Sequence, residues 1–140
     1  PIRNARVIRD LVVDSAHIER CNRSGKGWSE GIEEGRVSAQ EMERIEVQSD
    51  CILCASCYSA CPVYALNPDF IGPFALTRVW RYVNDPREPH SEAKIAAVQT
   101  NGIWDCTLCG ECVPVCPQGI APKQDITMLR MKASMMSIAP

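Results

Sequence analysis

The chain has 140 residues, of which 46% are hydrophobic, 23% charged and 6% aromatic, and its formal net charge is −2. These values are typical of one globular domain, and they exclude a disordered chain and the clustered basic face that nucleic-acid binding needs. No apolar run approaches the roughly 20 residues of a membrane span. The chain opens at Pro1 with neither Met nor a signal-peptide stretch, so we expect a piece of a longer polypeptide.

Residues 1–36 are expected to be a lead-in and linker segment. Residues 1–14 look extended or partly helical, while residues 22–36 are rich in Gly, Ser and charge, which predicts a surface loop. His17 is isolated and is given a surface or packing role by default. Cys21 is far from any other cysteine, which favours a buried or incidental thiol over an accessory role.

Helical signals dominate residues 37–140, which we expect to form one domain. Ser38 and Glu41 have the spacing of a capping box at the start of a helix. Apolar periodicity and terminating residues predict three more helices, within 67–86, 91–99 and 122–137. Because no segment shows sustained period-two alternation, the predicted fold class is mainly α.

The helix within 67–86 is predicted in most detail. Pro73 fits its first turn and Asn84-Asp85-Pro86 ends it, with apolar members at Phe74, Leu76, Val79, Trp80 and Val83. Its charged run is expected to be a solvated face, with docking to a partner as the alternative; the run is Arg78, Arg81 and Arg87. In the last helix, one face carries Ile126, Leu129, Ala133 and Met136. The methionines are expected in the core or at a subunit contact, at 128, 131, 135 and 136.

Eight of the nine cysteines form two quartets, and these are the strongest signal in the sequence. The first quartet reads CILCASCYSACP (51–62) and the second reads CTLCGECVPVCP (106–117). Each cysteine recurs 55 residues later, as 51/106, 54/109, 57/112 and 61/116, which indicates an internal duplication of one site. Disulfides need a restrictive geometry that compact quartets do not offer, so we expect metal binding in a reducing compartment.

Cys-x2-Cys-x2-Cys-x3-Cys-Pro is the run that binds cubane iron–sulfur clusters in bacterial ferredoxins. Three cysteines wrap one cluster, and the fourth cannot comfortably reach back, so each quartet lends its last cysteine to the other cluster. We therefore expect two 4Fe–4S clusters. The first has the ligands Cys51, Cys54, Cys57 and Cys116, and the second has Cys106, Cys109, Cys112 and Cys61.

Zinc is the alternative metal, but four-thiolate zinc sites usually use two separated Cys-x2-Cys pairs. His90 is isolated, like His17, and no catalytic triad, phosphate loop or dinucleotide fingerprint is present. No catalytic residue is predicted, and the domain should carry electrons without being catalytic alone.

The sequence resembles the C-terminal domain of the iron–sulfur subunit of succinate dehydrogenase and fumarate reductase. The resemblance rests on PVYALNPDFIGPFALTRVWRYVNDPRE, on CPQGIAP, and on PIRNARVIRDLVVD, which is similar to the link after the family's 2Fe–2S domain. It implies an α-helical ferredoxin-like fold with an internal two-fold repeat around two clusters. It also implies electron relay from a flavoprotein subunit to a membrane anchor or other carrier, at the inner, cytoplasmic face of the cell membrane. A 2Fe–2S cluster is expected only in an N-terminal domain outside this sequence.

Two departures from the family change the expectations. Usual members hold a 3Fe–4S cluster in the second motif, with an apolar residue where Cys109 stands, so this chain should hold a 4Fe–4S cluster there. Oxidative loss of one iron would convert it to 3Fe–4S. Thr107 stands where a His is common, and Tyr64 alone supplies an aromatic after Pro62, which puts a standard quinone pocket in doubt.

An electron-transfer domain of a fumarate reductase or succinate dehydrogenase-type complex is the leading hypothesis. The alternative is the iron–sulfur subunit of a heterodisulfide reductase or glycolate oxidase-type complex, built on the same cysteine repeat. A third is a structural metal module without redox cycling. The direction of the parent reaction stays open.

Overall fold

The computed structural model describes residues 3–31 and 35–138. An antiparallel hairpin of β1 (Val7–Arg9) and β2 (Val12–Val13) is followed by helices. These are α1 (Ala16–Ser24), α2 (Ala39–Glu43), α3 (Glu46–Ser49), α4 (Ser56–Ser59), α5 (Pro62–Leu66), α6 (Pro73–Val83), α7 (Ser91–Ala97), the π-helical turn η1 (Gln99–Ile103) and α8 (Pro122–Met135). The predicted fold class, mainly α, is confirmed.

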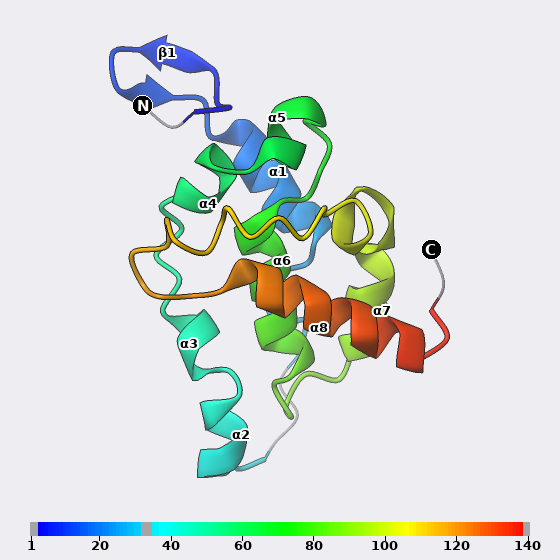
Figure 1. Ribbon diagram of the computed structural model, residues 1–140. Coiled ribbons are helices and arrows are strands. Elements are labelled where there is room, and N and C mark those ends of the chain that lie inside the picture. The colour runs from blue at the N-terminus through cyan, green and yellow to red at the C-terminus, as the bar shows by residue number, and fades with distance from the viewer. Residues whose placement is uncertain (1–2, 32–34, 139–140) are drawn as a thin grey trace.

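Helix α6 is the centre of the fold, and α3, α4, α7 and α8 all pack against it (Figure 1). It begins at Pro73 and ends before Asn84, as predicted, and its apolar face is buried except for the half-buried Trp80. Gly72 precedes it with φ of 89°. The ring of Tyr58 lies where a side chain at this position would be, so only glycine fits.

Helix α8 crosses α6 and completes the core from the other end of the sequence. Ile126, Leu129 and Ala133 are buried, as the periodicity predicts. Met128, Met131 and Met135 lie on the opposite, exposed face, so the core option is wrong for them, while a subunit contact remains open. Met136 is half-buried against the core.

Other predictions differ at the edges of the fold. The capping box of Ser38 and Glu41 is present, whereas α7 ends at Ala97, short of the predicted 99. The hairpin and α1 were not predicted, and residues 22–24 belong to α1 rather than to a loop. The sequence signal for α1 is weak because it places only Ile18 and Cys21 against the core.

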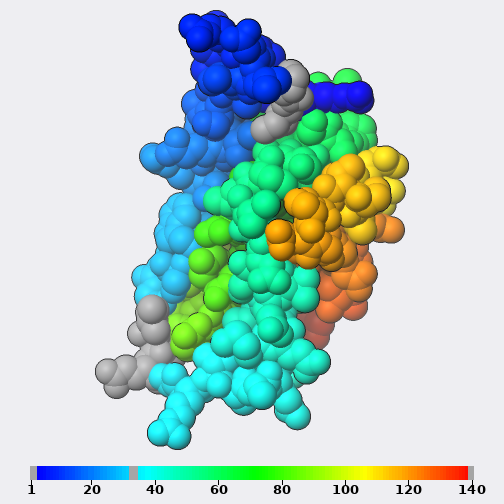
Figure 2. Space-filling view, turned by 90° about the vertical axis from the view of Figure 1, so that its left-hand side faces the viewer, coloured from blue at the N-terminus to red at the C-terminus, as the bar shows by residue number. Residues whose placement is uncertain are grey.

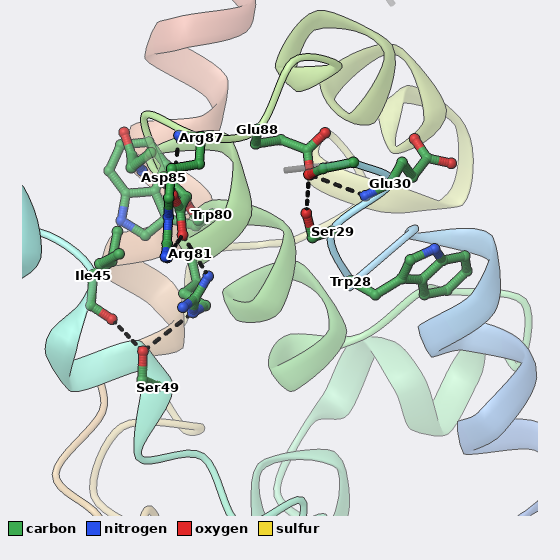
Figure 3. Close-up of polar contacts among 12 residues, drawn as sticks. Trp28, Ser29, Glu30, Ile45, Ser49, Trp80, Arg81, Asp85, Arg87 and Glu88 are labelled. Atoms are coloured by element: carbon green, nitrogen blue, oxygen red, sulfur yellow. Dashed lines mark hydrogen bonds and ion pairs between the residues drawn. The ribbon is translucent and has the colours of Figure 1, made fainter. Parts of the chain in front are cut away.

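The predicted solvated arginine face is wrong, because all three side chains bond within the chain. Figure 3 shows Arg81 and Arg87 beside Asp85. Arg81 donates to Ser49 Oγ and to Asp85 Oδ2, both at 3.1 Å, and Arg87 donates to both Asp85 oxygens at 2.8 Å. Arg78 donates to the carbonyl of Gly27 at 2.9 Å. Hydrogen bonds from Arg87, the largest influence, lower the pKa of Asp85 to about 2.

A buried lysine fastens the loop after α1 to α7. Lys94 is fully buried, and its Nζ lies 3.6 Å from carboxylate oxygens of both Glu30 and Glu88. It also donates to the carbonyls of Lys26 and Trp28. Buried charge is tolerated here because it is paired and hydrogen-bonded. Figure 3 shows Trp28, Glu30 and Glu88 around this junction.

Candidate metal centres

The first group of cysteines lines one cavity beside α4, α6 and the start of α8. Three belong to the first quartet and one to the second: Cys51, Cys54, Cys57 and Cys116. Phe74, Ile120 and Pro122 complete part of its wall. Figure 2 shows the orange segment near residue 115 lying against the green-cyan segment near residue 55. Cysteines that are 59 residues apart therefore share one site, since 116 − 57 = 59.

The second group brings Cys61 to the remaining cysteines of the second quartet. Burial is the main cause that raises the pKa of the Cys61 thiol, and the neighbouring Cys106 and Cys109 raise it further. Burial raises the pKa of Cys112 to about 11, with further contributions from Cys106 and Cys61. The cysteine charges that act on Cys61 are therefore those of Cys106 and Cys109, which belong to the second quartet.

The two groups are neighbours. Among the first three cysteines of each quartet, the third is the most buried: Cys57 and Cys112 are each 8% exposed. Burial raises the pKa of Cys57 to about 12, and the charges of Cys51, Cys112 and Cys54 add to it. The charge of Cys112, from the second quartet, thus acts on Cys57 of the first quartet.

The internal duplication extends from the cysteines to the backbone. Leu53 and Leu108 both have φ of 56°, and two residues later Ala55 and Gly110 have φ of 60° and 89°. Left-handed residues are uncommon outside glycine, so two matched pairs, each 55 residues apart, show that both loops wrap in the same way. These turns aim consecutive cysteines of a short loop at one centre.

Backbone N–H groups point at sulfur in the second group. Leu108 N donates to Cys106 Sγ and Tyr64 N donates to Cys61 Sγ, each at 3.4 Å. Cys61 is the N-cap of α5, with Pro62 in the first turn. Such donors stabilise thiolates and the sulfur of an iron–sulfur cluster.

Thiol chemistry fits a cluster. All nine cysteines are free, and burial favours the protonated thiol in each group. Positively charged iron would reverse that preference, so binding would release protons and stabilise the fold. Within residues 3–31 and 35–138, no three His, Cys, Asp or Glu side chains converge closely enough for a single ion. In a cubane, by contrast, each thiolate binds a different iron.

Sequence reasoning missed a cation at the second group. Arg130 of α8 donates to the carbonyls of Ile103, Trp104 and Cys106, with the first bond at 2.7 Å. Its guanidinium also lies 5.4 Å from the centroid of the Trp104 ring. The charge favours the thiolate form of Cys106. No local motif announces these contacts, because they join residues at least 24 positions apart.

Residues outside the two groups mostly have the roles that the sequence indicated. Cys21 is 5% exposed and donates to the carbonyl of Phe70, which confirms a buried thiol. His90 is exposed. His17 Nδ1 lies 2.7 Å from the Tyr64 hydroxyl, and burial lowers the pKa of His17. Thr107 is exposed within the second quartet.

None of the helices in the described part of the chain combines the length and apolar character that crossing a bilayer requires.

Comparisons with known proteins identify the family of the chain. The family described as "4Fe-4S dicluster domain" matches residues 47–120. The fumarate reductase iron-sulfur subunit of Mycobacterium tuberculosis is 39% identical over 96% of this chain and 58% of its own length. The 8-methylmenaquinol:fumarate reductase iron-sulfur subunit of Wolinella succinogenes is 36% identical over 95% and 44%. The mitochondrial succinate dehydrogenase [ubiquinone] iron-sulfur subunit 3 of Arabidopsis thaliana is 30% identical over 94% and 46%.

A solved structure shares the fold. A chain of the Mycobacterium smegmatis Sdh1 complex in the apo form matches with a TM-score of 0.83 at 21% identity, over 100% of this chain and 62% of that one. This chain spans about half the length of the curated relatives it matches.

Proposed function

Because the chain belongs to the 4Fe-4S dicluster domain family and is a homologue of fumarate reductase and succinate dehydrogenase iron–sulfur subunits, we propose that it relays electrons through two 4Fe–4S clusters. The relay runs between a flavoprotein subunit and a membrane anchor or another carrier. The complex lies at the inner face of the cell membrane. The observation that carries the proposal is the cavity that Cys116 of the second quartet lines together with three cysteines of the first, and the influence of Cys106 and Cys109 on Cys61 supports the reciprocal exchange.

The ligand sets follow from that regrouping. Cluster one is held by the cysteines that line the shared cavity: Cys51, Cys54, Cys57 and Cys116. Cluster two is held by the cysteines that influence one another around the second quartet: Cys106, Cys109, Cys112 and Cys61. This exchange ties the two halves of the repeat together, so cluster binding also contributes to folding.

When bound, each cluster supplies a one-electron carrier; the chain's own residues hold it and set its surroundings. Phe74 and Ile120 shield the first site from water. The N–H groups of Leu108 and Tyr64 donate toward sulfur at the second. Cys57 and Cys112 are buried members of different sites, and the charge of one acts on the other, which supports a route for electrons between the sites through the protein interior.

Cys109 supports a complete cubane in the second site. It is exposed, as is its counterpart Cys54, and both occupy the second position of their quartets. A fourth thiolate retains the fourth iron, and oxidation at this exposed corner would give 3Fe–4S. Aromatic side chains do not follow Tyr64 in α5, so we do not include quinone binding in the proposal.

Anaerobic reconstitution of the chain tests the proposal. We expect roughly eight iron and eight sulfide per chain, with two reducible clusters in redox-titrated EPR. The chain alone should neither reduce fumarate nor oxidise succinate. Zinc in place of iron would exclude the redox function, and clusters that cannot be reduced by a strong donor would leave only a structural module.

A further inference from the structure

The buried carboxyl group of Asp125 is connected to the first cysteine group through a single side chain, that of Thr77. Asp125 is in the first turn of α8 and is 3% exposed. Its Oδ2 accepts a hydrogen bond from Thr77 Oγ1 of α6 at 2.8 Å, and its Oδ1 accepts one from Gln48 Nε2 of α3 at 2.9 Å. Three helices therefore converge on one carboxyl group. Neutral donors alone bind it.

No cation compensates Asp125 in the part of the chain that the structure describes. None of the ion pairs there includes it, in contrast to Asp85, which has two arginines. The charged groups on the same three helices are exposed or bonded elsewhere: Glu46 of α3; Arg78 and Arg81 of α6; Lys123, Arg130 and Lys132 of α8. The titratable groups that line the adjoining cavity are the thiols of four cysteines: Cys51, Cys54, Cys57 and Cys116.

Thr77 connects this carboxyl to the cluster site. Thr77 and Pro122 line the same cavity as the four cysteines, and Thr77 is the donor to Asp125. One side-chain hydroxyl thus stands between the carboxyl and the place where the cluster would sit. Hydroxyl donors near cluster sulfur are among the features that set a cluster's potential.

We propose that Asp125 binds a proton when the first cluster accepts an electron, so that the reduction of this cluster is coupled to protonation. The inference rests on the proposed function. In it, Asp125 does not bind iron; it takes up the proton that balances the charge of the added electron. One electron from an external donor enters the cluster and one proton from solvent binds the carboxylate. The added charges cancel within one buried region, which avoids a second uncompensated negative charge there.

The resting state of the carboxyl favours this step. Burial raises the pKa of Asp125 to about 6, while the hydrogen bonds from Thr77 and Gln48 oppose the rise. A reduced cluster carries one more negative charge, and a like charge raises the pKa of a nearby carboxyl further. Protonation on reduction therefore falls in the neutral range.

Thr77 also gives the proton an effect on the cluster. Its hydroxyl has one hydrogen, which it donates to the ionised carboxylate. A protonated Asp125 can donate to Thr77 Oγ1 instead, which frees the threonine hydrogen to turn toward cluster sulfur. That donation would stabilise the reduced state.

The test is an EPR-monitored redox titration of the anaerobically reconstituted chain at several pH values between about 5 and 8. In the wild type, we expect the reduction equilibrium of the first cluster to change up to tenfold per pH unit, which is about 59 mV for one electron. Asp125→Asn should remove this dependence. Glu46→Gln, which neutralises an exposed carboxylate on α3, should retain it, and the second cluster serves as the internal control.

Two further measurements keep the test decisive. Thr77→Val should move the pH window upward, since the threonine hydrogen bond lowers the pKa of Asp125. The redox difference infrared spectrum of the wild type should show a carboxyl becoming protonated on reduction, which does not depend on any variant folding. A pH-independent first cluster, or a slope that persists in Asp125→Asn, would overturn the inference. Absence of iron would instead overturn the proposed function, so the two failures are distinguishable.

Discussion

After its third cysteine, the first quartet continues through α4 into α5, whereas the matching part of the second quartet consists of turns and bends. The loops before these segments share their left-handed residues, as Leu53 and Leu108 show. The duplicated loops thus share the backbone conformation that positions their cysteines, whereas the segments that follow them differ in secondary structure.

The surroundings of the two groups differ in charge. A helix α8 side chain reaches each one: Asp125 approaches the first through Thr77, and Arg130 binds the carbonyls that lead into the second. An acid beside one cluster and a cation beside the other would separate their potentials even with identical ligands. The duplicated cysteines thus determine the type of cluster, while side chains that are not duplicated, such as Asp125 and Arg130, influence its potential.

The largest expected effect comes from replacing the cysteine that each quartet contributes to the other cluster. Cys116→Ser should remove the first cluster while the second persists, with the loss of about four of roughly eight iron atoms. Cys61→Ser should remove the second cluster while the first persists. In each variant, the cluster that is lost is the one assigned to the other quartet. Iron analysis and EPR distinguish the clusters.

Cys21→Ser is the matched control for this pair, since its thiol is buried outside both groups, and it should retain the full iron content. Loss of the second cluster in Cys116→Ser would show that each quartet holds its own cube.

A smaller change distinguishes the second corner of each quartet. Cys109→Ile should release about one iron and give the EPR spectrum of an oxidised 3Fe–4S centre in the second site, while the first cluster persists. Cys54→Ile is its counterpart and should convert only the first site. Unchanged spectra in both variants would show that these exposed thiols are not ligands.

Much of the core follows from local sequence. The boundaries of α6, the capping box of Ser38 and the buried face of α8 all depend on residues within a few positions of one another. The exchange of Cys61 and Cys116 stays a prediction from spacing, and the regrouping of the thiols supports it.

Features that depend on distant partners were missed. Asp125 meets Thr77 and Gln48 across 48 and 77 positions, and nothing in the helical pattern of α8 marks it as buried beside a cluster site. Arg78 of α6 was misjudged for the same reason, because it bonds a carbonyl 51 positions away. The helical pattern does not reveal which distant residue will form a hydrogen bond with a polar side chain and bury it.

The charge difference between the two regions should also appear in stability. Asp125 has a folded-state pKa raised to about 6, so the wild type loses stability as the pH rises from about 4 through 6. Asp125→Asn removes that cost and should stabilise the reconstituted chain above pH 6 by roughly 3 kcal/mol. Thermal unfolding should show a Tm higher by several degrees near pH 8 and no difference near pH 3.5.

Glu46→Gln provides the comparison for a surface carboxylate and should leave Tm nearly unchanged at both pH values. A Tm for Asp125→Asn that falls equally at every pH would show that the carboxylate acts only through its hydrogen bonds.

The smallest effect tests the one difference between the matched left-handed turns. Gly110 has φ of 89°, and a Cβ there would meet only Lys123 Cδ at an ordinary 3.6 Å, so Gly110→Ala changes backbone strain rather than packing. Left-handed alanine costs about 1–2 kcal/mol, partly offset by lower entropy in the unfolded chain, so we expect a net loss of about 1 kcal/mol.

Ala55→Gly is the reciprocal change, and its balance is different. It relieves the same strain, yet it removes a methyl group that is 4% exposed beside the first cysteine group and gives the unfolded chain more freedom. These opposing contributions nearly cancel, so its Tm should match the wild type while that of Gly110→Ala falls by a few degrees. Equal and opposite shifts would mean that Ala55 makes no packing contribution, and that the two turns differ in sequence but not in energy.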